Sequence, residues 1–333
     1  MDFAERYLYL RSMPGGPKFT ETALLPLAES AEEVVFRRGV RLLAVDTLPE
    51  SVFFLMEGQV ELVERDGKSR GFIGAPGAVG ILALMGDCEM PYDVIAREEV
   101  VALSVDTDFF RETFEDNFDV ALEIMSSLAA NLAARRTQLP AGLQPPLTFP
   151  AHLARARELG LVERMLIIRR FDIFGPGALT GLTEVAQHFV EETYEAGDVL
   201  YRSGDHADMF YLLLSGSLRV EWPESVQMEG IGSPYGNLEA LGSLPRGATA
   251  TVVERVRLLR VPFETLVDVF EDHTDMMLAI IAQLARLVML FTGTVFNPDV
   301  VRSSAEIPAP PAASTQIPPP DPAPPPLMTS DPK

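Results

Sequence analysis

The chain has 333 residues, which is enough for two domains of ordinary size. Apolar residues make up 47% and charged residues 23%, so each domain can bury a core of normal globular composition. A net charge of −21 and a pI near 4.6 exclude DNA as a bulk partner, because phosphate backbones require a basic protein face. A single Arg with backbone N–H groups can still hold a small anion.

The cysteine content and the N-terminal residues both favour the cytoplasm. Cys88 is the single cysteine, which excludes an internal disulfide and fits a reducing environment. The N-terminus lacks a basic start followed by an apolar core, so we expect no secretory signal and a cytoplasmic protein. The most apolar run, 276–296, carries Gln283 and Arg286, which a bilayer would penalise by roughly a few kcal/mol. We therefore predict a buried or partner-facing helix and no membrane contact.

The sequence repeats itself. Residues 5–11 match residues 163–169 at an offset of 158, and after a variable loop in each copy the offset becomes 156. The aligned pairs include Phe36 with Tyr194, Gly39 with Gly197, Phe53 with Tyr211, Gly58 with Gly216, Gly80 with Gly236, Gly86 with Gly242, and Phe114 with Phe270. A repeat of this length indicates two copies of one structural unit. We predict domains at residues 1–137 and 151–300.

Within each copy the pattern changes from strand-like to helical. Gly-Asp pairs at 197–198 and 204–205 suit tight turns between strands, since Gly tolerates positive φ and Asp bonds nearby backbone. Short strands with regular turns predict an antiparallel roll whose open side is covered by the terminal helices. The expected elements of the second copy are a leading helix at 151–170, strands at 210–220 and 249–259, and helices at 263–271 and 274–291.

Two segments are rich in proline. Residues 138–150 contain four prolines and form the predicted linker between the copies. In residues 308–333, eleven positions are Pro, and such a segment cannot bury enough apolar surface to offset its ordering entropy. We predict a disordered, polyproline-leaning tail at 301–333 that acts as a solubilising segment or recruits a proline-reading domain.

Residues 235–249 read Tyr-Gly-Asn-Leu-Glu-Ala-Leu-Gly-Ser-Leu-Pro-Arg-Gly-Ala-Thr. With the stretches at 194–205 and 210–220 they resemble a cyclic nucleotide-binding domain, whose phosphate-binding cassette runs Phe-Gly-Glu-Leu-Ala-Leu and then Pro-Arg-Ala-Ala-Thr. The resemblance covers both copies, about four-fifths of the chain. It implies a mainly β fold with flanking helices: two tandem jelly-roll-like double-stranded β-helix domains of the catabolite-activator and kinase-regulatory-subunit type.

The resemblance also implies a ligand site in the second copy. Arg246 aligns with the Arg that pairs with the cyclic phosphate, and its planar donor fork suits an anionic oxygen pair. Gly236 allows the sharp turn, Thr249 adds a hydroxyl, and the strand around Val220 with the last helix walls the base. Backbone amides near Glu239, Ala240 and Ala248 bond the phosphate. The alternative is that Arg246 is a solvated side chain on a surface turn.

Two cassette positions depart from the family pattern. Asn237 replaces the Glu that takes the ribose 2′-OH, just before Leu238, and a neutral acceptor predicts weaker or altered ribose recognition. Glu239 stands where a small residue is usual, next to the expected phosphate. Its carboxylate repels the ligand, moves in to replace the missing Glu, or faces the surface.

The first copy lacks the cation of the site. Ile81, Met90 and Asp93 match Asn237, Arg246 and Thr249, and Asp87 and Glu89 add two more carboxylates to the same turn. The acidic spacing fits no metal-binding loop, so we predict a solvated acidic turn and no metal site. This copy reads as a degenerate domain kept for packing, dimerisation or interdomain contact. Cys88 is expected to be a small core residue rather than a redox sensor.

Other function classes fit the sequence less well. The four histidines are scattered without a His-x-His pair, which argues against a metal-dependent enzyme, and neither a nucleophile elbow nor a P-loop occurs. About forty proline-rich residues follow the last helix, too few for a helix-turn-helix domain. The prediction is therefore a protein that is not an enzyme and needs no cofactor.

The function that the resemblance implies is that of a regulatory or sensor protein. It binds cAMP or cGMP in the second domain and relays this to a protein partner through helix 274–291, which also offers a surface for a homodimer. No DNA binding is expected. The alternative is a ligand-free scaffold in which both domains have lost nucleotide binding and serve protein assembly.

Overall fold

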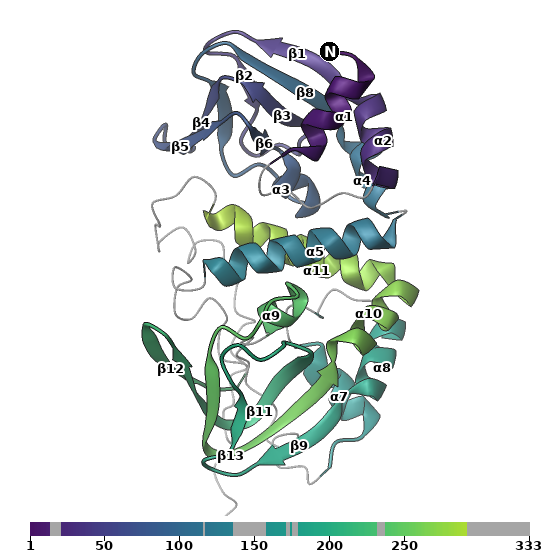
Figure 1. Cartoon of the computed structure of the whole chain (residues 1–333), viewed down its shortest axis with the longest axis vertical. Helices are drawn as coiled ribbons and strands as arrows, with labels where there is room; N and C mark the ends of the chain where they lie inside the picture. The colour runs from purple at the N-terminus through teal and green to yellow at the C-terminus, as the bar shows by residue number, and fades with distance from the viewer. Residues whose placement is uncertain are drawn as a thin grey trace, which may run out of the picture. The chain divides into compact units, whose positions relative to one another are not determined.

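Two β-rolls, one in each half of the chain, dominate the computed structural model (Figure 1). The structure describes residues 1–13, 21–115, 117–135, 158–170, 174, 179–231 and 237–291. The predicted linker 138–150, the predicted tail 301–333 and Gly236 lie outside the described residues. The predicted bounds of the two domains stay predictions.

The first roll consists of two antiparallel sheets with strand orders β1-β8-β3-β6 and β2-β7-β4-β5. Two helices precede it and two follow it. Its elements are α1 (Phe3–Arg11), α2 (Glu21–Ser30), β1 (Glu32–Phe36), β2 (Arg41–Leu43), β3 (Ser51–Glu57), β4 (Gln59–Val63), β5 (Ser69–Gly74), β6 (Gly77–Val79), α3 (Ile81–Met85), β7 (Asp93–Ala96), β8 (Val100–Asp106), α4 (Thr107–Glu115) and α5 (Phe118–Ala134).

The second roll is one sheet of order β10-β13-β11-β12, with β9 also paired to β13. The predicted strands and the two predicted C-terminal helices are confirmed, and α7 confirms part of the helix expected at 151–170. Its elements are α7 (Leu161–Ile168), α8 (Leu179–His188), β9 (Val190–Tyr194), β10 (Val199–Tyr201), β11 (Met209–Trp222), β12 (Ser225–Glu229), α9 (Asn237–Leu241), β13 (Thr249–Pro262), α10 (Phe263–Asp272) and α11 (Thr274–Phe291).

One glycine in each roll shows why the repeat is structural. Gly58, between β3 and β4, has φ +86°, and Gly216, inside β11, has φ +84°. A Cβ on Gly58 would lie 2.4 Å from the Glu99 carbonyl oxygen, and one on Gly216 would lie 2.4 Å from that of Arg255. Only glycine fits such a close approach with positive φ. In both copies the backbone at this glycine therefore approaches a neighbouring carbonyl equally closely.

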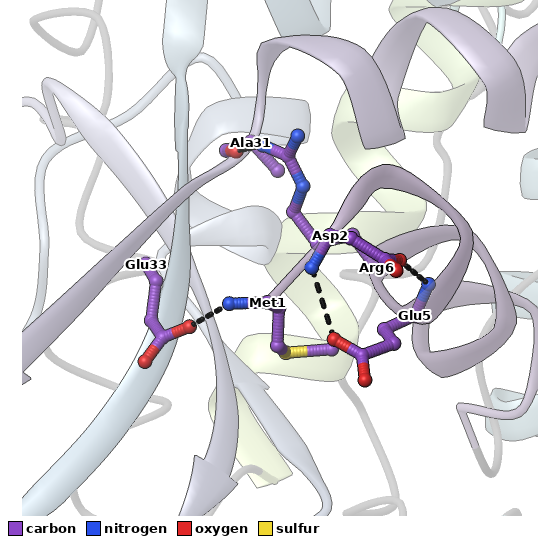
Figure 2. Close-up of polar contacts among 6 residues, drawn as sticks. All are labelled: Met1, Asp2, Glu5, Arg6, Ala31 and Glu33. Atoms are coloured by element: carbon purple, nitrogen blue, oxygen red, sulfur yellow. Dashed lines mark hydrogen bonds and ion pairs between the residues drawn. The ribbon is translucent and has the colours of Figure 1, made fainter.

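The helix before each roll is held by the same contact. Asp2 caps the N-terminus of α1, and Arg6 of α1 donates to the carbonyl of Ala31, next to β1 (Figure 2). Arg164 of α7 donates from Nη1 to the Phe189 carbonyl at 2.7 Å, next to β9. Arg164 follows Arg6 by 158 residues, and Phe189 follows Ala31 by the same number. The repeat therefore extends to side-chain contacts.

The long helices α5 and α11 pack against each other and connect the two rolls (Figure 1). Helix α5 also packs on α9, the short helix of the second roll, and α11 packs on α3, the short helix of the first roll. One apolar core therefore includes residues of both rolls, while each roll keeps a smaller core inside its barrel. Each long helix thus covers the short helix of the opposite roll.

Helix α11 has the length and apolar composition of a membrane span, and among the described residues it is the single helix that has both. More than half of that 18-residue window, 56%, is buried inside the structure. A core helix of a folded domain passes the same test, as predicted for residues 274–291. Its apolar faces are covered by the first copy within the chain, so a homodimer through this helix would first have to uncover them.

Candidate ligand-binding site

The turn from α9 to β13 follows the same backbone path as the turn from α3 to β7. In the second roll the Arg246 N–H donates to the Asp205 carbonyl at 2.8 Å. In the first roll the Met90 N–H donates to the Thr47 carbonyl at 2.9 Å. The cassette geometry is therefore present twice, and differences between the rolls come from side chains.

Arg246 is buried at the centre of the second cassette, with 2% of its surface exposed. Its Nη2 donates to the Met209 carbonyl at 2.5 Å, and its guanidinium carbon lies 4.6 Å from the Tyr201 ring centroid and 5.5 Å from that of Tyr211. A desolvated guanidinium over aromatic rings gains about 2 kcal/mol from cation–π attraction. The alternative of a solvated arginine on a surface turn is wrong.

Asn237 begins α9 and ties it to the neighbouring strand. Its side chain is 3% exposed; Oδ1 accepts from the Tyr211 N–H at 2.9 Å, and Nδ2 donates to the Tyr211 carbonyl at 3.0 Å. The amide thus pairs with β11 as a strand residue would. Because an amide oxygen has a second lone pair, a ribose hydroxyl would have to share Oδ1 with the strand. The predicted ribose contact stays a prediction.

The next residues of α9 point into the fold. Glu239 is 4% exposed and Ala240 is fully buried, while Leu238 is half-buried against the shared core. The alternative of a surface-facing Glu239 is therefore wrong. The buried Glu239 carboxylate adds a negative charge to the cassette. A small residue at this position would not supply that charge.

The other side of the cassette leads into β13. Ala248 is buried, and the Thr249 hydroxyl oxygen accepts from the Ser203 N–H at 3.1 Å. A Cβ on Gly247 would lie 2.5 Å from Cζ3 of Trp222, so the indole covers this glycine. The structure therefore places Arg246, Ala248 and Thr249 on one tightly packed turn, while Gly236 is outside the described residues.

A small pocket lies between the strands, lined in part by the two rings that Arg246 contacts. The rings of Tyr201 and Tyr211 stack in its wall, with centroids 6.2 Å apart and planes 26° apart. Burial raises the pKa of Tyr211, and Arg246 acts in the opposite direction. The described lining comes from strands, whereas α11, predicted as a wall of the base, packs on α3 and α5. The lining residues are Leu200, Tyr201, Tyr211, Leu213, Leu218, Glu229 and Leu258.

Glu229 is the site residue that sequence reasoning missed. It ends β12 and is 6% exposed, although glutamate is rarely buried. The signal was available in the alternation of residues 225–229, where Val226 and Met228 fall on one face and Glu229 on the other. The pocket wall therefore contains a carboxylate and two flat aromatic rings, and Arg246 lies against those rings.

The cassette turn of the first roll carries bulkier apolar side chains. Tyr92 stands at the position of Ala248 and is buried, and the guanidinium carbon of Arg70 lies 5.6 Å from its ring centroid. Burial raises the pKa of Tyr92 to about 12. Met90 and Met289, the latter from α11, belong to the same apolar core. Tyr92 and Met90 thus belong to the apolar core of the first roll, where the second roll has Ala248 and Arg246.

The acidic turn of the first roll is solvated only in part. Asp87 and Glu89 are exposed, as predicted. Asp93 is not: it is half-buried, and its Oδ1 accepts from the Val45 N–H at 2.9 Å, the bond that Thr249 makes in the second roll. Asp93 therefore closes a turn of the roll instead of facing water.

Cys88 is half-buried against the core of the first roll, and burial raises the pKa of its thiol. A raised pKa disfavours the thiolate and lowers reactivity, in line with the predicted core role. Within the described ranges, no group of three or more His, Cys, Asp or Glu side chains is arranged to hold a metal ion.

Curated proteins with similar sequences share only part of their length with this chain. A patatin-like phospholipase domain-containing protein of Caenorhabditis elegans is 34% identical over 115 residues, which is 34% of this chain and 8% of that protein. The cAMP-dependent protein kinase regulatory subunit of Yarrowia lipolytica is 26% identical over 158 residues, 45% of this chain and 42% of that protein. The matches span less than half of either relative.

Solved structures with a similar arrangement include kinase regulatory subunits. The regulatory subunit of a cAMP-independent protein kinase A from Trypanosoma brucei is 15% identical with a TM-score of 0.34, covering 87% of this chain and 90% of that chain. The cAMP-bound PfPKA-R (141–441) is 13% identical with a TM-score of 0.36, covering 90% and 93%.

The family profile described as cyclic nucleotide-binding domain matches this chain twice, at residues 33–117 and 191–273. The two matches fall on the two rolls and together make up about half of the chain. With both rolls and both cassettes in place, the chain belongs to the cyclic nucleotide-binding domain family.

Proposed function

We propose that this protein is a non-enzymatic cytoplasmic sensor that binds a cyclic nucleotide, cAMP or cGMP, in its second roll. The observation that carries the proposal is Arg246, a buried cation on the cassette turn beside an aromatic pocket. A planar guanidinium can bond two phosphate oxygens at once. The first roll has Met90 in its place and serves packing and relay.

The pocket next to Arg246 supports a small organic ligand. Ligand pockets in proteins have apolar and aromatic walls with a few polar groups. The second roll offers four leucines, the stacked Tyr201 and Tyr211 rings, and Glu229. A bound phosphate would take over the guanidinium hydrogen bond that now goes to the Met209 carbonyl.

The contact between α9 and α5 supports a relay from the cassette. A Cβ on Gly242, just after α9, would lie 3.0 Å from the backbone nitrogen of Ala130 in α5. In the first roll, Gly86 stands at the equivalent position, and its carbonyl accepts from Arg286 Nε of α11 at 2.6 Å. Ala130 and Arg286 are themselves equivalent, 156 residues apart.

The long helix of each roll thus contacts the cassette of the other roll at equivalent positions, and these contacts couple the two rolls. Because α5 touches the second cassette and packs along α11, a shift of α9 on ligand binding would move both long helices. Closely packed helices transmit such shifts as rigid bodies. We propose that the moved α5–α11 pair changes the surface offered to a protein partner.

Calorimetric titration of the full chain with cAMP and cGMP tests the site. Arg246→Ala is expected to weaken binding between about 10-fold and 100-fold, because a buried charged hydrogen-bond donor is lost. Arg255→Ala is the matched control, since that side chain is 71% exposed. No heat with either nucleotide would contradict the sensor function, and equal affinity of the Arg246→Ala variant would contradict the assigned site.

Hydrogen exchange tests the relay separately. Addition of the nucleotide that binds is expected to change amide protection in α5 around Ala130 and in α11 around Arg286, besides the change in the second roll. A change confined to the second roll would leave binding in place and refute the relay.

One observation favours the alternative of a ligand-free scaffold. Both polar atoms of the Asn237 amide are bonded to β11, and Glu239 buries a negative charge on the cassette helix. In that case both rolls serve protein assembly alone, and the titration above gives no heat for either nucleotide.

A further inference from the structure

Arg246 is covered by two tyrosine rings of the second roll. The rings of Tyr201 and Tyr211 line the pocket and lie against the guanidinium, whereas Arg246 is not among the residues that line it. With 2% of its surface exposed, Arg246 is closed to an anion from solution. A ligand in this pocket meets the rings before it meets the guanidinium. Binding of a phosphate therefore requires that one ring moves first.

The two rings differ in how firmly their backbone is held. Tyr211 lies inside β11, where its N–H and carbonyl bond the Asn237 amide at 2.9 and 3.0 Å and its strand pairs with β13. Tyr201 ends β10, a strand of three residues at the edge of the sheet, and the strand register shifts just before it. Short, irregularly paired segments open at lower cost than central strands. Tyr201 is therefore the ring that can move.

The turn that follows Tyr201 is bonded to the backbone of Arg246. The Gly204 N–H donates to the Arg246 carbonyl, and the Arg246 N–H donates to the Asp205 carbonyl, both at 2.8 Å. These two bonds connect the end of β10 to the cassette turn. A shift of the cassette therefore reaches Tyr201 through the backbone as well as through its ring.

The first roll has neither the ring nor the cation. Leu43 precedes Tyr201 by 158 residues, and Met90 precedes Arg246 by 156. Leu43 and Met90 are buried in the same apolar core. A leucine thus meets the needs of the roll at this position when no arginine faces it. In this chain the aromatic ring accompanies the arginine.

We propose that Tyr201 is an autoinhibitory gate: its ring covers Arg246 in the closed state that the structure describes, and it moves away with the end of β10 when a nucleotide binds. This inference rests on the proposed function of the same site. A guanidinium over an aromatic face is attracted to it, most strongly where water is excluded. The closed state is therefore stabilised by the same cation that a phosphate uses. Binding needs the open state, whose population limits the association rate.

Chemical modification by phenylglyoxal, an arginine-selective reagent, tests the gate without any nucleotide. In the wild-type full chain, Arg246 is expected to react more than about 10-fold more slowly than Arg255, whose side chain is 71% exposed, as mass spectrometry of peptides would measure. Tyr201→Leu, which copies Leu43, is expected to raise the rate at Arg246 about 10-fold, because the desolvated cation–π contact is lost. Tyr201→Phe keeps the ring and is the control with an unchanged rate.

The single tryptophan of the chain gives a second readout. Trp222 covers Gly247, the residue after Arg246, so its fluorescence reports on the cassette turn. After rapid mixing with cAMP or cGMP, the wild-type rate is expected to level off at high nucleotide concentration, at the rate of gate opening. Tyr201→Leu is expected to raise this limit about 10-fold. Circular dichroism checks that each variant folds, and the wild-type rates at Arg246 and Arg255 decide if Tyr201→Leu does not.

The outcomes separate the gate from the proposed function. Equal reactivity of Arg246 and Arg255 in wild type, or an unchanged rate at Arg246 in Tyr201→Leu, overturns the gate and leaves the sensor function standing. A rate at Arg246 that rises equally in Tyr201→Phe also overturns it, because the ring is then not the cover. If neither nucleotide binds, the sensor function fails, and the reagent still decides whether Tyr201 closes off Arg246.

Discussion

Where the second roll has Arg246 and Ala248, the first roll has Met90 and Tyr92 on the same backbone path. The Arg246 side chain lies against the stacked tyrosines that line a pocket, whereas Tyr92 and Met90 belong to an apolar core. The comparison shows that one backbone accommodates either a buried arginine against aromatic rings or an apolar core. The choice depends on a few side chains near the cassette.

The largest expected effect concerns the filling of the first roll. Tyr92→Ala, which copies Ala248, removes a buried aromatic side chain and is expected to lower the free energy of unfolding by about 3–5 kcal/mol. Chemical denaturation measures this loss. If Tyr92→Ala costs less than about 1 kcal/mol, the ring does not fill the first roll in the way described.

A slightly smaller loss is expected at the shared glycine. Gly216→Ala would place a Cβ 2.4 Å from the Arg255 carbonyl oxygen at φ +84°, so we expect a loss of about 3 kcal/mol in stability. Gly197→Ala is the control: φ is +95° but nothing lies within 4 Å, so only about 1 kcal/mol should be lost. Equal losses at the two positions would contradict the close approach.

The smallest expected effect is a pH dependence in the first roll. Burial raises the pKa of Tyr92 to about 12, above its ordinary value of 10, so the unfolded chain releases this proton first. The corresponding stability is complete below about pH 10 and is lost as the pH rises toward 12, by up to about 1.4 kcal/mol per pH unit. Tyr92→Phe should flatten the stability profile in this window, which denaturation at pH 9 and pH 11 would measure. An unchanged profile would refute the burial of the phenol.

The sequence predicts the fold well because the repeat is visible in it. The spacing of Gly58 and Gly216, and of the Gly-Asp turns, reflects backbone constraints that allow few other residues. The confirmed turns at Gly197 and Gly204 have positive φ, and Asp198 and Asp205 accept from nearby backbone N–H groups, as predicted. Local backbone requirements can thus be derived from sequence.

The site was less predictable, because its side chains meet through pairing between distant strands. The resemblance identified Arg246, but it gave no reason to expect Asn237 to bond with β11 or Glu229 to line the pocket. Nor could spacing show that Tyr92 fills the first roll or that α5 covers α9. These contacts depend on strand register and on packing between the two copies.

The number of ligands bound per chain tests most directly whether one roll is a site and the other is sealed. Titration of the full chain with cGMP and cAMP should give one site per chain, and Arg246→Met, which copies Met90, should remove it while the protein stays folded. Two sites per chain, or one site that survives Arg246→Met, would contradict this account of the two rolls.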